Sequence, residues 1–446
     1  MKIVIAGAGD VGFHLAELLS IENIDIILID LEQDVLDYAA THLDVLTLRG
    51  DCASIDLLEQ AQVEDARLFL AVTTSEKTNL VASILAKKLG AKQVIARVDN
   101  SEYLCGEQKE IFKELGIDIL MSPIQLAANE IERLIQRCNF TDLFEFEKGK
   151  INLAGLTLRK DSPLVDTKVK DLNKVQKGEH LRPIAILRGH ETIIPKGDTI
   201  LKSNDHIYFL TKRENIEELE SILGERRKDI KRIMIIGGDK LSVATAQILE
   251  KNYQVTLIVK DKKTAIELSE ILHSTLIIRG DYSNVELLKE EGLGNMDAFL
   301  ALTENSETNI IASLTAKNYG VFKTIAQVEN KEYIHLSQNI GVDTLINKKL
   351  IAANNIFRFV RKGKIEAVTS LHGVDAEVIE FVIHKENRTT RHPIKELHFP
   401  PTAIIGGVIR GEDSLLPDGN FQLQVGDKVV VFSLPESIAK LEKIFS

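Results

Sequence analysis

The chain has 446 residues, of which 44% are hydrophobic and 27% charged, a balance typical of a globular protein with a large buried core. Its formal net charge of −11 disfavours broad electrostatic binding to nucleic acid or to an anionic membrane surface. Three scattered cysteines exclude a disulfide framework and favour a reduced, intracellular setting. No secretory signal is expected, and no apolar run reaches the ~18 residues of a membrane-spanning helix.

Short aliphatic runs alternate with helical patterns at the start of the chain, which predicts an α/β fold with a doubly wound parallel sheet, a Rossmann-like domain. Strands are expected at Ile3–Ala6, Ile26–Asp30, Val45–Leu48, Leu68–Val72, Val94–Val98 and Ile117–Met121. Helices are expected after Asp10, Glu32, Ala53, Ser75 and Ser101.

A further helix is expected after Ser122, with Pro123 at its first position. Its apolar stripe consists of Ile124, Ala127, Ile131, Leu134, Ile135 and Cys138. Such a stripe must be buried. Packing on its own sheet and a crossover role at a dimer interface both remain open.

A smaller, β-rich part follows. It contains expected strands at Ile151–Leu158, Ile184–Leu187 and His206–Leu210, a turn at Asp205, and a helix over Glu214–Leu223. The charged stretch Gly224–Lys231 is the expected linker to the second half. There the pattern returns with strands at Ala403–Ile409 and Lys428–Phe432 and a helix from Glu436.

The two halves are copies of each other. Arg49-Gly50-Asp51 aligns with Arg279-Gly280-Asp281, and Thr78-Asn79 aligns with Thr308-Asn309. This period is too long for a solenoid, so the whole domain pair is duplicated. We expect Rossmann-like domains over 1–140 and 230–362, and small α+β domains over 141–226 and 363–446.

The run Gly7-Ala8-Gly9-Asp10-Val11-Gly12 follows the first expected strand and opens a helix, the context of a dinucleotide-binding fingerprint. Gly7 would allow the tight turn, Gly9 the approach of a pyrophosphate, and Gly12 close packing of the helix on the sheet. The helix N-terminus offers amide donors to phosphates. Asp30 ends the second strand, where a carboxylate accepts ribose hydroxyls and repels a 2′-phosphate, which favours NAD(H) over NADP(H).

Asp51, Thr73, Thr74 and Arg97 follow later strands, at the edge of a parallel sheet where ligands bind. Asp51 could reach the adenosine, the threonines the phosphates or ribose, and Arg97 a di- or triphosphate. The alternative for the first three is turn formation and helix capping, which Ser75 and Thr73 could provide equally well, and the alternative for Arg97 is an ion pair with a neighbouring acid. The Asp10 carboxylate would repel a bound phosphate unless its side chain points into solvent. Alternatively, Asp10 selects against ligands with extra phosphate charge near this turn.

The second copy has lost most of the fingerprint. Gly9 becomes Asp239, Gly12 becomes Ser242, Asp30 becomes Lys260 and Arg97 becomes Gln327. Steric fit, charge and ribose recognition therefore all fail, and we expect the second half not to bind NAD(H). Lys260 leaves another phosphate ligand open. No catalytic triad, acid–base pair or metal-ligand spacing is present in the small domains, so no catalytic residue and no metal site are expected.

The duplication, the Gly7–Gly12 motif, the Gly50-Asp51 turn, Thr73–Asn79 and Ala96-Arg97-Val98 resemble the TrkA family, regulatory subunits of Trk potassium uptake systems. The resemblance implies two RCK (KTN) domains, each a Rossmann lobe followed by an RCK_C lobe. It implies a cytoplasmic homotetramer, peripheral on the inner face of the membrane, beneath an ion-conducting TrkH-like subunit. It also implies NAD(H), with ATP/ADP as alternative ligands, in a site lined by Gly7, Gly9, Gly12, Asp30, Asp51, Thr73 and Arg97.

Ligand sensing by a transport regulator is the leading hypothesis, since nucleotides of different charge can favour different conformations. The alternatives are an NAD-dependent oxidoreductase, which would need an acid–base group over the nicotinamide, and an RCK regulator of another ion transporter.

Overall fold

The computed structural model describes residues 2–20, 24–137, 140, 142–146, 151–158, 160–172, 182–189, 191–212, 229–330, 333, 341–360, 365–370 and 377–445. The chain divides into two compact units. One contains Met1–Glu130, Gly238–Ile248 and Ile346–Val360, and the other contains Ile131–Gly237, Leu249–Leu345 and Arg361–Ser446. Two short segments of the second half therefore belong to the same unit as the first Rossmann lobe.

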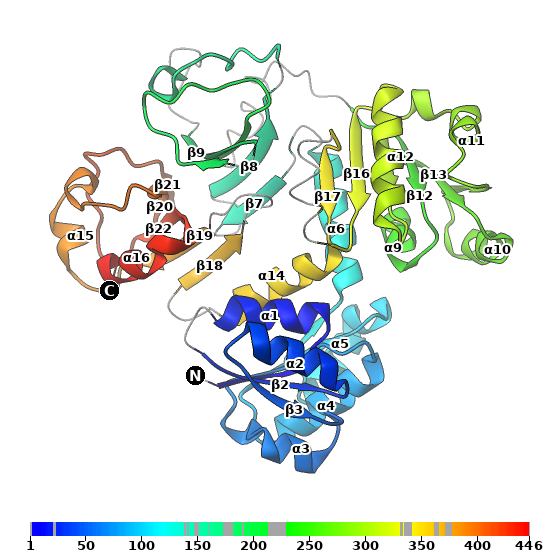
Figure 1. Cartoon of the computed structure of the whole chain (residues 1–446), viewed down its shortest axis with the longest axis horizontal. Coiled ribbons are helices and arrows are strands. Elements are labelled where there is room, and N and C mark those ends of the chain that lie inside the picture. The colour runs from blue at the N-terminus through cyan, green and yellow to red at the C-terminus, as the bar shows by residue number, and fades with distance from the viewer. Residues whose placement is uncertain are drawn as a thin grey trace. The chain divides into compact units, whose positions relative to one another are not determined.

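The first lobe, coloured blue to cyan in Figure 1, is built on a six-stranded parallel sheet in the order β3-β2-β1-β4-β5-β6. Its strands are β1 Lys2–Ala6, β2 Asp25–Asp30, β3 Leu46–Arg49, β4 Leu68–Ala71, β5 Gln93–Arg97 and β6 Ile119–Met121. Its helices are α1 Asp10–Ser20, α2 Gln33–His42, α3 Ile55–Gln60, α4 Glu76–Leu89, α5 Gly106–Glu114 and α6 Pro123–Gln136. The strand order reverses between β1 and β4, the point where such sheets bind ligands.

The expected fold class is confirmed, and element boundaries differ in detail. A 3₁₀ turn over Ser101–Leu104 precedes α5, because Asn100 Oδ1 accepts the amide proton of Glu102 and Cys105 is extended. On α6, the stripe residues Ala127, Ile131, Leu134 and Ile135 are buried, and Cys138 lies outside the described residues.

The second copy repeats the parallel sheet in the order β14-β13-β12-β15-β16-β17. Its strands are β12 Arg232–Ile236, β13 Gln254–Val259, β14 Leu276–Arg279, β15 Ala298–Ala301, β16 Lys323–Gln327 and β17 Thr344–Ile346. Its helices are α9 Lys240–Leu249, α10 Lys262–Ile271, α11 Val285–Glu290, α12 Ser306–Asn318 and α14 Lys348–Val360. Duplication of the Rossmann architecture thus holds strand for strand.

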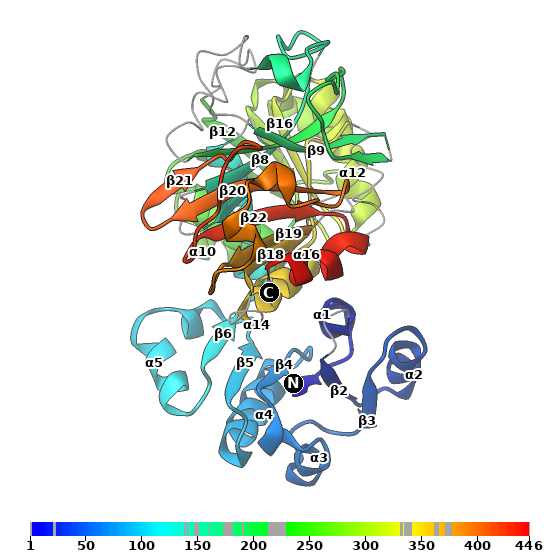
Figure 2. The ribbon, with the colours of Figure 1, turned by 90° about the vertical axis from the view of Figure 1, so that its left-hand side faces the viewer.

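Each C-terminal lobe is an antiparallel five-stranded sheet. The first has the order β10-β9-β11-β8-β7, with β7 Asp142–Phe146, β8 Ile151–Thr157, β9 Arg182–Arg188, β10 Glu191–Ile193 and β11 His206–Lys212. The second, whose strands lie side by side in Figure 2, has the order β18-β19-β22-β20-β21. Its elements are β18 Ile365–Ser370, β19 Glu377–Val382, α15 Arg388–Arg391, β20 Ala403–Arg410, β21 Asp413–Leu415, β22 Lys428–Ser433 and α16 Ile438–Phe445.

The same buried ion pair closes the turn before the last strand in both C-terminal lobes. Arg188 Nε lies 2.7 Å from Asp205 Oδ1, and Arg410 Nε lies 2.8 Å from Asp427 Oδ1. Both aspartates are fully buried, so each turn aspartate also accepts a charge-assisted bond that fixes the turn. The expected helix Glu214–Leu223 and most of the linker Gly224–Lys231 lie outside the described residues. The last expected helix begins at Ile438, after a 3₁₀ turn.

Candidate functional site

The three glycines between β1 and α1 have separate structural roles. Gly7 has φ +108°, and a Cβ on it would lie 2.8 Å from Thr73 N. A Cβ on Gly12 would lie 1.8 Å from Gly7 O, so only glycine lets α1 approach the turn so closely. A Cβ on Gly9, in contrast, would meet nothing within 4 Å. The turn and helix packing thus depend on Gly7 and Gly12, while Gly9 faces open space.

Asp30 is tied directly to this glycine turn. Its Oδ2 accepts the amide proton of Ala8 at 2.6 Å, and its Oδ1 accepts that of Glu32 at 3.1 Å. A carboxylate has about four acceptor positions, so lone pairs remain for hydroxyl donors. The side chains of Ala8 and Val11 are buried, so these two residues can offer a ligand only their backbone.

Asp51 forms the turn after β3, as the structural alternative expected. Its Oδ1 accepts the amide proton of Ala53 at 2.9 Å, and its carbonyl accepts that of Ser54 at 2.9 Å. The neighbouring Cys52 is buried, and no sequence motif marks it as a functional residue. Burial first, and then the negative charges of Asp51 and Asp30, raise the pKa of the Cys52 thiol to about 11.

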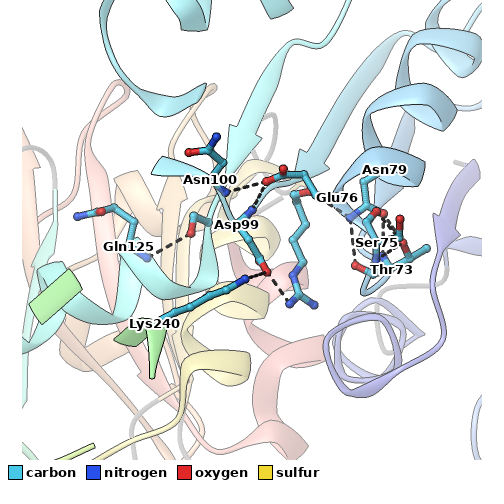
Figure 3. Close-up of polar contacts among 10 residues, drawn as sticks. Thr73, Ser75, Glu76, Asn79, Asp99, Asn100, Gln125 and Lys240 are labelled. Carbon is cyan, nitrogen blue, oxygen red and sulfur yellow. Dashed lines mark hydrogen bonds and ion pairs between the residues drawn. The ribbon is translucent and has the colours of Figure 1, made fainter. Parts of the chain in front are cut away.

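Thr73 belongs to a buried hydrogen-bond cluster centred on Asn79, as Figure 3 shows. Asn79 Oδ1 accepts the Thr73 amide proton at 2.9 Å and its hydroxyl proton at 2.7 Å, while Asn79 Nδ2 donates to the carbonyls of Thr73 and Arg97. Asn309 makes the same four contacts with Thr303 and Gln327. Because the copy without the fingerprint keeps the cluster, its role is to join β4 to β5.

The residues that follow Thr73 start helix α4. Ser75 is its N-cap, with the side-chain oxygen accepting the amide proton of Thr78 at 3.3 Å. Thr74 is exposed beside it. The capping alternative therefore describes this segment without a ligand, and Thr74 is left with its side chain toward solvent.

Arg97 makes an ion pair rather than standing alone at the sheet edge. Its Nη2 lies 3.6 Å from Asp99 Oδ1, and Lys240 Nζ lies 3.0 Å from Asp99 Oδ2 (Figure 3). Glu76 Oε2 accepts the amide protons of Asp99 and Asn100 at 2.6 and 2.7 Å. Lys240 opens α9 in the second half, so no local pattern around Arg97 could have revealed it.

Asp10 is likewise matched by a cation from the second half. Its Oδ2 lies 2.5 Å from Lys349 Nζ, and α14, which carries Lys349, packs on α1. The Asp10 side chain is 70% exposed. Both contacts are made within one compact unit.

At the aligned positions of the second copy, each polar side chain contacts another residue of the chain. Asp239 Oδ1 accepts the amide proton of Ser242 at 3.0 Å, so α9 is capped by its own chain. Lys260 Nζ lies 3.0 Å from Asp281 Oδ1 and 4.4 Å from the centre of the Tyr282 ring. The fully buried Gln327 donates to Glu329 at 3.0 Å.

Two general features of the described part of the chain bear on function. It contains no group of three or more His, Cys, Asp or Glu side chains that could hold a metal ion. Within the same residues, no helix has both the length and the apolar character needed to cross a membrane.

Comparison with solved structures identifies the fold. The GsuK RCK domain covers 100% of this chain and 94% of its own, with a TM-score of 0.61 at 16% identity. The GsuK channel covers 99% of this chain and 78% of its own, with a TM-score of 0.62 at 16% identity. The fold is therefore that of tandem RCK domains.

Sequence models of two domain families give the family itself. The TrkA-N domain matches residues 3–123 and 233–348, and the TrkA-C domain matches residues 153–224 and 378–446. The chain belongs to the TrkA family.

Curated relatives match over the full length. The Trk system potassium uptake protein TrkA homolog of Archaeoglobus fulgidus is 36% identical over 100% of both chains. The Trk system potassium uptake protein TrkA of Vibrio alginolyticus is 33% identical over 100% of this chain and 98% of its own. Both relatives are named as potassium uptake proteins, so the oxidoreductase alternative is not retained.

Proposed function

We propose that the chain is a cytoplasmic regulatory subunit that binds NAD(H), with ATP/ADP as alternative ligands, and gates a TrkH-like potassium-transporting membrane subunit. The observation that carries this proposal is the open turn at Gly9, which faces no protein atom within 4 Å beside the N-terminus of α1. The names of the TrkA relatives support the transport role, and a GsuK channel with this fold was solved bound to NAD.

In this proposal each site residue has a defined task. Gly9 and the first amides of α1 receive the phosphates, because a helix N-terminus favours anions. Asp30 keeps the glycine turn in place and accepts ribose hydroxyls. Arg97 exchanges part of its contact with Asp99 for phosphate oxygens, and Asp51 and Thr74 border the site.

We assign the nucleotide to the first lobe alone. In the second lobe, the Asp239 carboxylate occupies the helix N-terminus where phosphate would bind, and Lys260 replaces the ribose acceptor with a cation held by Asp281. A ligand there would have to break both contacts. The homotetramer, the peripheral position on the membrane, and the domain limits 1–140, 141–226, 230–362 and 363–446 belong to the same proposal.

Gly9→Ala provides the sharpest test of the ligand site. The added Cβ meets no protein atom, so the melting temperature should stay unchanged, while a methyl group at the phosphate position should weaken NADH and ATP binding at least tenfold. Isothermal titration of the full chain measures both affinities and stoichiometry. One NADH per chain is expected, whereas two per chain, or unaltered affinity in the variant, would refute the assignment.

Gating is tested separately, with the full chain and a TrkH-like subunit in potassium-loaded vesicles. Flux should differ between ATP and NADH, because a ligand shifts a conformational equilibrium only through its differential affinity for the two states. The Gly9→Ala variant should abolish that difference. Nucleotide-independent flux with intact nucleotide binding would reject the gating role and leave the binding site standing.

A further inference from the structure

We propose that Lys349, from the second half of the chain, is a specificity-determining residue of the first nucleotide site. Its task is to neutralise Asp10, so that anionic ligands can approach the N-terminus of α1 and highly charged nucleotides are not rejected. This inference rests on the nucleotide site proposed above.

Asp10 stands where a negative charge most opposes phosphate binding. It is the first residue of α1 and directly follows Gly9. The N-terminus of a helix carries roughly +0.5 of an elementary charge, which a neighbouring carboxylate would more than cancel for an incoming anion. From the sequence alone, the Asp10 carboxylate is an unfavourable charge within the dinucleotide-binding fingerprint.

In the structure, the negative charge of Asp10 is paired with the ammonium group of Lys349. Lys349 Nζ lies 2.5 Å from Asp10 Oδ2, and the Lys349 side chain is only 29% exposed. Asn347 Oδ1 accepts the amide protons of Lys349 and Leu350 at 3.0 and 3.1 Å, which fixes the start of α14. The cation is thus delivered by a capped helix that packs on α1.

Local helix energetics give no reason for this lysine. Lys348 and Lys349 open α14, where the helix dipole disfavours positive charge. The aligned residues of the first copy are Pro123 and Ile124, and the residue aligned with Asp10 is Lys240. The Asp10–Lys349 pair therefore exists at only one of the two glycine turns, the one with the intact fingerprint.

Stability of the fold is a weak explanation for such a pair. An ion pair with one partner this exposed contributes little to folding stability, because solvent screens the attraction. Its effect on a polyphosphate ligand is different in kind, because it sets the net charge beside the phosphate position.

A double-mutant cycle that removes each charge of the pair tests the proposal, by titration of the full chain with ATP, ADP and NADH. Lys349→Met leaves Asp10 unpaired and should weaken ATP binding roughly fivefold, with smaller losses for ADP and NADH, which carry less charge. Asp10→Asn should tighten ATP binding by a similar factor. The double variant has a neutral site again and should return to within about twofold of the wild-type affinity.

The exposed pair Lys113 and Glu110 on α5, 3.4 Å apart in the same unit, gives matched controls. Lys113→Met and Glu110→Gln change net charge equally and should leave all three affinities unchanged. Higher salt should shrink the Lys349→Met effect, because screening weakens exposed charges. Melting temperatures identify any variant that is simply misfolded.

The outcomes separate this inference from the function it rests on. If the wild-type chain binds none of the three nucleotides, the proposed site fails and Lys349 has no such role. If the wild type binds but Lys349→Met matches it, or if the double variant is as weak as Lys349→Met, only the charge-neutralising role is overturned.

Discussion

Several single residues at the carboxyl edge of the first parallel sheet make hydrogen bonds that stabilise the fold without any ligand. Asp30 anchors the glycine turn through the Ala8 amide, and Asn79 joins the ends of β4 and β5. The Asn79 cluster recurs in the second lobe around Asn309, where the dinucleotide fingerprint is absent. Position at this edge is therefore not enough to identify a ligand-binding residue. Thr73, for example, is hydrogen-bonded to Asn79 within the protein.

Cys52 should report on the charge of the site. Its pKa is raised from an ordinary 9.0 to about 11, because burial and then the Asp51 and Asp30 carboxylates disfavour the thiolate. In a background with Cys105 and Cys138 replaced by serine, Asp51→Asn should lower the pKa at which Cys52 ionises. Thiolate absorbance against pH measures that value, and a pKa unaffected by Asp51→Asn would contradict the electrostatic contribution.

The same shift predicts how stability depends on pH. The folded-state pKa lies above the unfolded one, so the contribution of the protonated thiol is complete below about pH 9 and is lost as pH rises towards 11. A shift of about two pKa units corresponds to a contribution of about 3 kcal/mol to the free energy of unfolding. Urea unfolding of Cys52→Ala, compared with the wild type at pH 8 and pH 10.5, should show the gap between them narrowing at the higher pH.

At the scale of elements, the β1–turn–α1 unit was predictable because its constraints are local. The spacing of Gly7, Gly9 and Gly12 is a property of one strand, one turn and one helix, and the structure gives Gly7 and Gly12 the packing roles expected of them. The capping of α4 by Ser75 was predictable for the same reason. The sequence did not decide the roles of Asp51 and Thr73, because turn formation and ligand contact use the same polar atoms.

Gly12→Ala should break this unit, in contrast to Gly9→Ala. The new Cβ would lie 1.8 Å from Gly7 O, a backbone atom that cannot move without shifting the turn or the helix. We expect a loss of about 3 kcal/mol or more in the stability of the first lobe. Hydrogen exchange of peptides from β1 and α1 measures this locally, with Gly9→Ala as the control. Equal protection in the two variants would show that the helix can retreat from the turn.

At the scale of the whole molecule, the two C-terminal sheets share a hydrophobic core. One cluster joins Ile151, Tyr208 and Leu210 of the first lobe to Val430 and Phe432 of the second. A different cluster, which includes Phe209 and Leu156, lies within the first lobe. The duplicated C-terminal lobes are therefore coupled by packing inside one unit.

Phe432→Ala and Phe209→Ala should distinguish the cluster shared by the two C-terminal sheets from the cluster within the first of them. Both side chains are fully buried, and each truncation should cost about 3–5 kcal/mol. Phe432→Ala should raise hydrogen exchange in β22 and also in β8 and β11, because its cavity opens onto the first lobe. Phe209→Ala should raise exchange in the first lobe only. If the effect of Phe432→Ala stays within β19–β22, the lobes are not energetically coupled.

The amino-acid sequence by itself determined the duplicated architecture and the order of strands and helices, and it is the source of the site residues proposed between Gly7 and Arg97. It could do so because strand and helix periodicity, glycine turns and the register of a repeat depend on neighbours in the chain. The resemblance to the TrkA family rested on the same local motifs.

Only the tertiary structure decided which cations pair with the acidic residues Asp10 and Asp99 of the first lobe. Lys240 and Lys349 lie far along the chain from Asp99 and Asp10, and no spacing rule connects them. Ion pairs between distant segments follow from how helices pack, which is set by the whole core rather than by any one element. The dinucleotide fingerprint lies in the first half of the chain, whereas Lys240 and Lys349, which pair with Asp99 and Asp10, lie in the second half.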